Sequence, residues 1–167
     1  MTNPRKPFRI NVGFIVHEEV GYSHTFPFEF EHIKLDDFEV SNLNGSVHIG
    51  RTPQGLIAQG SFSGDTKLQC VRCLKDFAYP LSWSFAELYA FDKDSVSETG
   101  VLLPEDRQID LALMLREYAL LEVPISPLHN EDCKGLCIEC GQDLNLEDCG
   151  HSQGNNDSPF SMLEKLL

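Results

Sequence analysis

Every cysteine of this chain belongs to one of two separated groups whose spacing is typical of metal binding. The first group is a CxxC pair, and the second carries four cysteines with a second CxxC inside it. One histidine lies just before the second group and another just after its last cysteine. Six thiols and two imidazoles are enough for two closed tetrahedral sites, the coordination that structural zinc adopts. The eight candidate ligands are Cys70, Cys73, His129, Cys133, Cys137, Cys140, Cys149 and His151.

The spacing leaves two partitions of these ligands open. The preferred one joins the ligands from Cys70 to Cys133 in a first site and those from Cys137 to His151 in a second. The alternative is one site of Cys133, Cys137, Cys140 and Cys149, with the first CxxC free or weakly bound. Either way we expect the metal to be Zn²⁺, and it is preferred over iron only by its frequency in such sites. A redox role for Cys70 and Cys73 is disfavoured, because a strand pattern and not a helix follows them.

Acidic side chains are concentrated in the second half of the chain. Residues 1–91 hold 10 acidic and 8 basic residues, whereas residues 92–167 hold 16 and 5, which together give the net charge of −13. Such a field does not favour binding to a phosphate backbone, so any nucleic-acid contact must use a local basic patch. The acidic half would instead attract a basic partner, although acidity alone is most often a matter of solubility.

Alternating apolar residues predict a β-rich first half. The alternation runs over 8–16, 22–30, 47–49, 56–70 and 77–85. Pro27 indicates an edge strand or a bulge, the segment 51–55 a turn, and Gly60 with Gly64 a bulge or bend. The first CxxC therefore falls in a hairpin between two strands, where a zinc knuckle is expected.

Helical spacing of apolar residues appears after a polar stretch. Asp110 is the expected cap of a helix that runs to about Val123, followed by two prolines that end it. The segment 129–151 has few large apolar side chains, so we expect metal to supply its stability. A short helix at 159–167 is expected to follow a linker.

These patterns predict an α+β fold with a β-rich antiparallel sheet or partial barrel, one covering helix and a zinc-stapled C-terminal segment. The expected divisions are a β-rich domain at 1–91 with the first knuckle, a mobile acidic loop at 92–108 and a helix with a Pro-rich connection at 109–128. A zinc-binding segment at 129–151 is expected to pack on the β domain, and 152–167 to form the linker and last helix. The chain has no membrane-length apolar run and no secretory signal, so a cytoplasmic bacterial protein is expected.

An enzymatic role is not expected from these residues. His129-Asn-Glu131 before Cys137-x2-Cys140 superficially resembles the signature of zinc deaminases. Only five residues separate Glu131 from Cys137, and Leu136 stands where that signature has proline. A catalytic zinc also keeps an open coordination position, which eight ligands for two ions do not imply.

Three stretches together resemble the YceD family, the large ribosomal RNA subunit accumulation proteins of bacteria and plastids. They are Cys70-Val-Arg-Cys73-Leu74, the helix from Ile109 into Val123-Pro124, and the stretch from Pro127 through Cys133-Lys-Gly-Leu-Cys137 to Cys149 with Leu144-Asn145. Many members of the family have cysteine where this chain has His129 and His151, a replacement that zinc accepts. The resemblance implies a non-enzymatic role in the accumulation of large-subunit rRNA.

The resemblance implies large-subunit rRNA or a large-subunit ribosomal protein as the partner, and no membrane or small-molecule substrate. We hypothesise an RNA contact at Lys67, Arg72 and Lys75, where aromatic residues lie close in sequence. The competing interpretation is that Tyr79 and Trp83 belong to the strand core. The alternatives for function are an acidic module that docks a basic ribosomal protein and, less favoured, a zinc-dependent RNA-processing enzyme.

Overall fold

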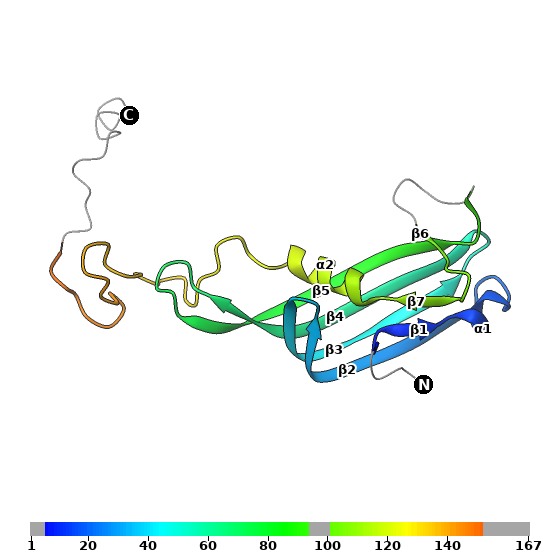
Figure 1. Ribbon diagram of the computed structural model, residues 1–167, viewed down its shortest axis with the longest axis horizontal. Helices are drawn as coiled ribbons and strands as arrows, with labels where there is room; N and C mark the ends of the chain where they lie inside the picture. Colours follow the sequence, from blue (N-terminus) through cyan, green and yellow to red (C-terminus); the bar gives the residue numbers. More distant parts are fainter. Residues whose placement is uncertain (1–5, 94–100, 152–167) are drawn as a thin grey trace, which may run out of the picture. The chain divides into compact units, whose positions relative to one another are not determined.

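The computed structural model describes residues 6–93 and 101–151, and the chain divides into two compact units. We call Met1–Leu68 with Ala78–Ile125 the sheet unit, and Gln69–Phe77 with Ser126–Leu167 the cysteine unit. The helices and strands of the described residues (Figure 1) are β1 (Arg9–Asn11), α1 (Gly13–Val16), β2 (Ser23–Leu35), β3 (Phe38–Arg51), β4 (Gly55–Gln69), β5 (Asp76–Ala90), β6 (Val101–Leu102), β7 (Gln108–Asp110) and α2 (Ala112–Leu121).

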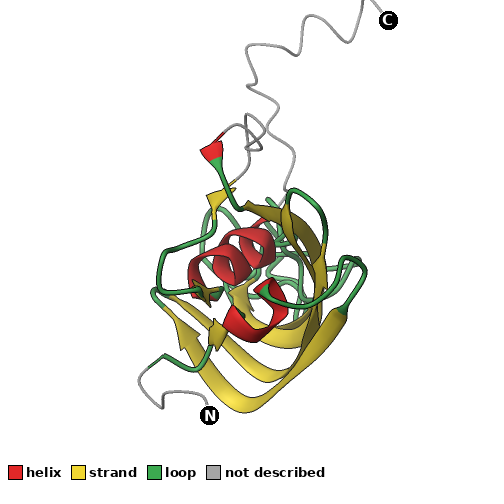
Figure 2. Ribbon diagram, turned by 90° about the vertical axis from the view of Figure 1, so that its right-hand side faces the viewer, coloured by secondary structure: helices red, strands yellow, loops and turns green. Residues whose placement is uncertain are grey.

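The sheet unit is built on an open five-stranded sheet of order β2-β3-β4-β5-β6. β2 pairs antiparallel with β3 and β3 with β4, while β5 pairs in parallel with the short β6. β1 and β7 form a separate antiparallel pair. The main sheet curves around both helices (Figure 2) without closing into a barrel. A β-rich fold with few helices is confirmed, and the parallel strand was not anticipated.

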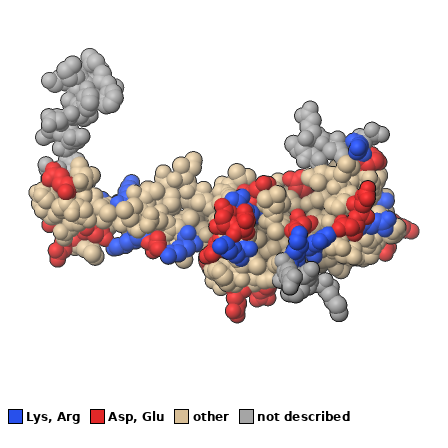
Figure 3. Space-filling view, viewed as in Figure 1, with Lys and Arg blue, Asp and Glu red and all other residues tan. Residues whose placement is uncertain are grey.

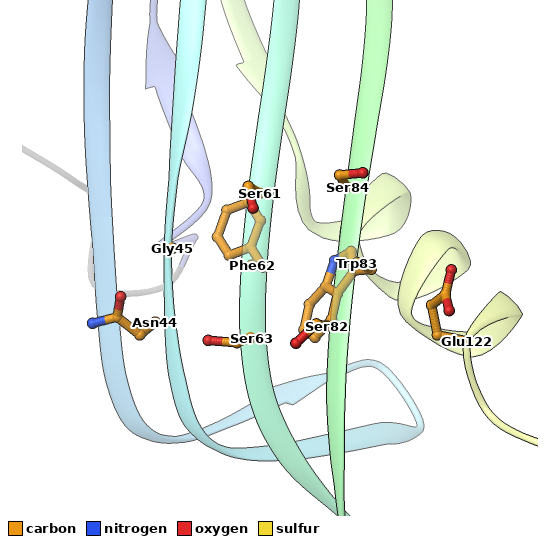
Figure 4. A pocket seen from close by; sticks show the side chains of 9 residues that line it. All are labelled: Asn44, Gly45, Ser61, Phe62, Ser63, Ser82, Trp83, Ser84 and Glu122. Atoms are coloured by element: carbon orange, nitrogen blue, oxygen red, sulfur yellow. The ribbon is translucent and has the colours of Figure 1, made fainter.

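Aromatic side chains from neighbouring strands fill the concave side of the sheet. The ring of Phe62 stacks on Trp83 with 5.9 Å between centroids and on Phe85 with 6.3 Å. Figure 4 shows Phe62 and Trp83 on adjacent strands, with Gly45 beside them. A Cβ at Gly45 would lie 2.4 Å from the Phe62 ring, so this close packing requires glycine. Trp83 is therefore a core residue, as the competing sequence interpretation held.

Two strand predictions need correction. The alternation at 8–16 forms only the short β1, because the chain then turns into α1, where the Asn11 side chain accepts a hydrogen bond from the Gly13 N–H at 2.9 Å. In the pairing of β3 with β4, the bulge lies on β3, between Ser41 and Asn44, and not at Gly60 or Gly64 of β4. Asn42 occupies it with a positive φ of 52°, a conformation that asparagine tolerates.

The helix and loop boundaries also differ from the sequence expectations. α2 is shorter than 110–123, and Leu111 rather than Asp110 holds the cap position. Asp110 still accepts a hydrogen bond from the Ala112 N–H at 3.2 Å, so it satisfies one of the free amides at the helix start. The expected loop at 92–108 contains β6 and the first residue of β7. The linker and helix expected at 152–167 lie outside the described residues.

Candidate metal centres

The cysteine unit has very little hydrophobic core of its own. Its only cluster of buried residues in the described part consists of Cys70, Cys73 and Cys133, with three partly buried apolar side chains against it. Three thiols bury too little apolar surface to offset the conformational entropy of ordering this segment. The unit therefore needs another source of stability, and ligation of a metal would supply it.

The two CxxC turns have the same backbone geometry. In the first, the Leu74 N–H donates to the Cys70 carbonyl at 2.9 Å, and in the second the Gly141 N–H donates to the Cys137 carbonyl at 2.9 Å. The residue after each second cysteine has positive φ, 58° at Leu74 and 73° at Gly141. Each turn directs two thiols and several backbone N–H groups to one point, which is the arrangement of a zinc knuckle.

The first cluster combines the first knuckle with residues more than fifty positions later. The Sγ atoms of Cys70 and Cys133 are 3.8 Å apart, and Nδ1 of His129 lies 3.3 Å from Sγ of Cys73. One ligand atom from each of the four residues lies within 4.8 Å of the others. Its three cysteines are buried and His129 is exposed, so the thiols are shielded while one side faces solvent.

The second cluster is assembled from Cys137, Cys140, Cys149 and His151, again with all four ligand atoms within 4.8 Å of one another. Nδ1 of His151 lies 3.8 Å from Sγ of Cys137, and its Nε2 lies 3.7 Å from the Glu139 carboxylate. Cys140 and His151 are exposed, which makes this cluster the more accessible of the two.

The donor sets fit Zn²⁺. Sulfurs that each lie ~2.3 Å from one tetrahedral zinc are about 3.8 Å apart, which is the separation of Cys70 and Cys133. That separation is far too long for a disulfide. Three thiols and one imidazole in each cluster suit zinc better than the hard oxygen-seeking cations. The structure thus brings together the two sets of four of the preferred partition, and zinc ligation by them stays a prediction.

In each cluster one cysteine has a lowered pKa, which favours the thiolate that metal binding requires. Burial opposes ionisation of Cys70, but hydrogen bonds from the His129 side chain and nearby backbone N–H groups lower its pKa to about 5. Backbone hydrogen bonds from Cys140 and Glu139, against the effect of burial, lower the pKa of Cys137 to about 6. In both clusters the local hydrogen bonds thus favour the ionised thiol, the form that binds metal.

Within the cysteine unit, the first knuckle is tied to the later segment by hydrogen bonds and an ion pair. The Arg72 guanidinium donates to the Cys133 carbonyl at 2.8 Å, and the Leu136 N–H donates to the Arg72 carbonyl at 3.1 Å. Lys75 lies 2.6 Å from Asp143 and lowers the pKa of that carboxyl to about 2. Gly135 closes the contact, because a Cβ there would lie 3.0 Å from the Arg72 carbonyl.

The residues proposed to contact RNA are therefore engaged differently from what the sequence suggested. Arg72 and Lys75 hold the cysteine unit together, while Lys67 belongs to β4 of the sheet unit. Trp83 is buried in the core, and Tyr79 is partly buried against it. On the face drawn in Figure 3, basic and acidic side chains are interspersed and form no continuous basic surface over the described residues. Direct RNA contact at these positions stays a prediction.

The cleft beside Gly45 offers little chemistry. It has a volume of about 410 Å³ and is lined by serines, Asn44, Phe62, Trp83 and, as its one ionisable side chain, Glu122. A single exposed carboxylate supplies no acid–base pair.

Among the helices of the described residues, none combines the length and apolar character that crossing a bilayer would take.

Sequence reasoning found all eight candidate ligands but gave no contact role to Asn145 or Asp143. Asn145 donates from Nδ2 to Sγ of Cys133 at 3.5 Å, from twelve residues away. The Leu144-Asn145 pair stood in the motif that carries the family resemblance, and this was the available signal. No spacing rule predicts a hydrogen bond between these two positions.

Comparison with known proteins finds relatives that align with large parts of this chain. An uncharacterized protein of Mycobacterium tuberculosis is 28% identical over 141 residues, covering 82% of this chain and 67% of the relative. The uncharacterized protein YlbN of Bacillus subtilis is 32% identical over 109 residues, covering 64% of this chain and 63% of the relative. No solved structure gives a significant match.

A plant relative carries a functional name. The Large ribosomal RNA subunit accumulation protein YCED homolog 1, chloroplastic, of Arabidopsis thaliana is 32% identical over 63 residues, which are 38% of this chain and 20% of that protein. The family model described as Large ribosomal RNA subunit accumulation protein YceD matches residues 58–167. This match spans both knuckles and most of the chain, and the chain therefore belongs to the YceD family.

Proposed function

We propose that this chain is a non-enzymatic, zinc-binding factor that supports the accumulation of large-subunit (23S) ribosomal RNA. The observation that carries the proposal is the family match over residues 58–167, which contains both candidate metal clusters. The family name and that of the Arabidopsis relative supply the link to large-subunit rRNA.

Zinc has a structural role in this proposal. Each cluster offers four protein ligands, which fill a tetrahedral shell and leave no position for water or substrate. The metal would hold the two segments of the cysteine unit in one conformation, and that unit would contact the partner. Loss of metal would then remove the function by unfolding the unit, without any chemical step.

Depletion of the protein in its native cell tests this function. The ratio of large- to small-subunit rRNA should fall, and the wild-type chain should restore it. A chain with Cys73→Ser and Cys140→Ser should not restore the ratio, because one ligand of each cluster is lost. An unchanged ratio after depletion would contradict the role in rRNA accumulation.

A second candidate, a module that docks a basic ribosomal protein, is favoured by the charge of the cysteine unit. Its described residues carry seven acidic side chains and three basic ones, a net charge of −4 with neutral histidines. Of the three basic side chains, Lys75 pairs with Asp143 and Arg72 binds main-chain oxygens. A cationic protein segment matches this field better than a phosphate backbone does.

Affinity purification of the tagged chain, with and without nuclease, distinguishes the two partners. Large-subunit rRNA recovered only without nuclease favours association with RNA or with a ribosomal particle. A basic ribosomal protein that persists after nuclease and is released by salt favours the docking module. A zinc-enzyme role is tested separately by Glu131→Gln, which should restore rRNA accumulation as well as wild type; failure of this variant, with its metal bound, would contradict the non-enzymatic proposal.

A further inference from the structure

Asn145 lies among the ligands of the second cluster in the sequence, but its side chain bonds a ligand of the first cluster. It lies between Cys140 and Cys149, in the loop that ligands of the second cluster close. Its side chain, however, reaches the first cluster, where Nδ2 donates to Sγ of Cys133 at 3.5 Å. One side chain thus connects the loop of one candidate site with a thiol of the other.

The orientation of the Asn145 amide is fixed by its other partners. Oδ1 accepts a hydrogen bond from the Lys134 N–H at 2.8 Å, and only the carbonyl end of the amide can accept it. Nδ2 must then face the opposite way, where it donates to Asp143 at 2.7 Å and to Cys133. The thiol of Cys133 therefore faces an N–H donor and not a carbonyl oxygen.

A second link runs beside the first. Asp143, two residues before Asn145, accepts hydrogen bonds from the Asn145 backbone and side chain and pairs with Lys75 at 2.6 Å. Lys75 follows Cys73 by two residues, so the loop of the second cluster is held against the first knuckle as well. Asp143 and Asn145 thus both join this loop to the first cluster.

We propose that Asn145 is a positioning residue that couples the two metal sites. The inference rests on the metal binding in the proposed function and adds a dependence of one site on the other. A hydrogen bond to a metal-bound thiolate orients it and stabilises its charge, and loss of such a partner typically weakens metal binding about 10- to 100-fold. Metal in the second site holds the loop closed, keeps the amide on Cys133 and so tightens the first site.

Cadmium NMR on the full-length chain separates the two sites. The wild-type chain should bind two ions and give two resonances, and His129→Cys should move only the resonance of the first site. A wild-type chain that binds no metal would overturn the metal-binding function and the coupling together. Two bound ions leave the function standing and make the coupling testable by itself.

Two variants of Asn145 test the hydrogen bond. Asn145→Ala removes both ends of the amide, whereas Asn145→Asp keeps the acceptor for Lys134, removes the N–H donor and adds a negative charge beside Cys133 and Asp143. Both should shift the first-site resonance and weaken the first site by about 10- to 100-fold. The control is Gln142→Ala, in the same loop, where the main-chain oxygen and not the side chain receives the Cys137 hydrogen bond.

Wild-type behaviour of the first site in Asn145→Asp, with the second site unchanged, would overturn the proposal. Coupling is measured by adding Cys149→Ser, which disables the second site. This change should lower the metal affinity of the first site in the wild-type chain. The loss of affinity should be much smaller when Asn145 is already alanine. If the fold-losses in first-site affinity of the two single variants simply multiply in the double variant, Asn145 does not connect the sites.

Discussion

The two units of this chain contrast in what stabilises them. Among the described residues, the hydrophobic core of the sheet unit contains 22 buried residues, including stacked aromatic rings, whereas the buried cluster of the cysteine unit consists of three cysteines. The first unit can fold by removing apolar surface from water. The second depends on hydrogen bonds, an ion pair and ligand atoms that converge on two points.

This difference shows why one short chain can contain two folding principles. The first CxxC turn lies between β4 and β5, and it supplies two of the four candidate ligands of the first cluster. The stability of the cysteine unit thus does not depend on large apolar side chains. Its surface can instead carry carboxylates suited to a basic partner.

Metal removal should have the largest effect and should act on one unit only. Structural zinc contributes ~10–16 kcal/mol of apparent binding free energy to small domains. After chelation, residues 69–77 and 126–151 should lose hydrogen-exchange protection together, while β3 and the paired part of β4 keep theirs. Hydrogen-exchange mass spectrometry measures this. Loss in only one of the two segments would contradict their common dependence on metal.

A core substitution should produce the converse result. Phe62→Ala removes a ring that stacks on two others, and we expect it to lower the free energy of unfolding of the sheet unit by ~3–5 kcal/mol. Zinc stoichiometry should stay unchanged. Urea denaturation monitored by Trp83 fluorescence measures the free energy of unfolding, and metal analysis measures the zinc stoichiometry. The neighbouring Ser63→Ala, on an exposed position, should behave like wild type.

Arg72 offers a smaller change within the cysteine unit. Arg72→Met removes the hydrogen bond to the Cys133 carbonyl and should destabilise the unit by on the order of 1 kcal/mol. The zinc released by a fixed chelator concentration should increase accordingly, while the unfolding transition of the sheet unit stays in place. If Arg72→Met retained metal like wild type but lost RNA, the sequence-based RNA patch would gain support over this structural role.

Exchanging residues between the two equivalent knuckles should have effects similar in size to that of Arg72→Met. Leu74 holds a positive φ of 58°, which costs a leucine about 1–2 kcal/mol relative to glycine. Leu74→Gly should therefore slow zinc release, and Gly141→Leu should speed it, since Gly141 has positive φ but free space around its Cα. Release rates that change in the same direction in both variants would contradict the equivalence of the two turns.

The sequence predicted the strands better than their connections. Alternation identified the core-facing aromatics of β2 and β5, because each strand has one buried face. It failed at Phe14, an exposed ring in α1, because alternation does not show that Asn11 turns the chain. It also suggested a bulge or bend at Gly60 and Gly64, although these glycines make room for Phe85 and Val40 of neighbouring strands.

The candidate site was the most predictable part of the molecule. Thiols and imidazoles are few, and knuckle geometry constrains their spacing, so the eight candidate ligands could be named in advance, and the observed grouping is the preferred one of two partitions. The surrounding contacts could not, because the bonds of Asn145, Asp143 and Arg72 join positions far apart in the chain. The expected domain boundaries and the helix at 159–167 stay predictions.

Native mass spectrometry of the full-length chain, purified without added metal or chelator, tests the central claim most directly. The account predicts a single dominant species that carries two zinc ions with all six cysteines reduced. In the variant with Cys73→Ser and Cys140→Ser, both ions should be lost or weakly held. A metal-free chain with a protected, folded cysteine unit, or one with its cysteines joined in disulfides, would contradict the claim that metal holds this unit together.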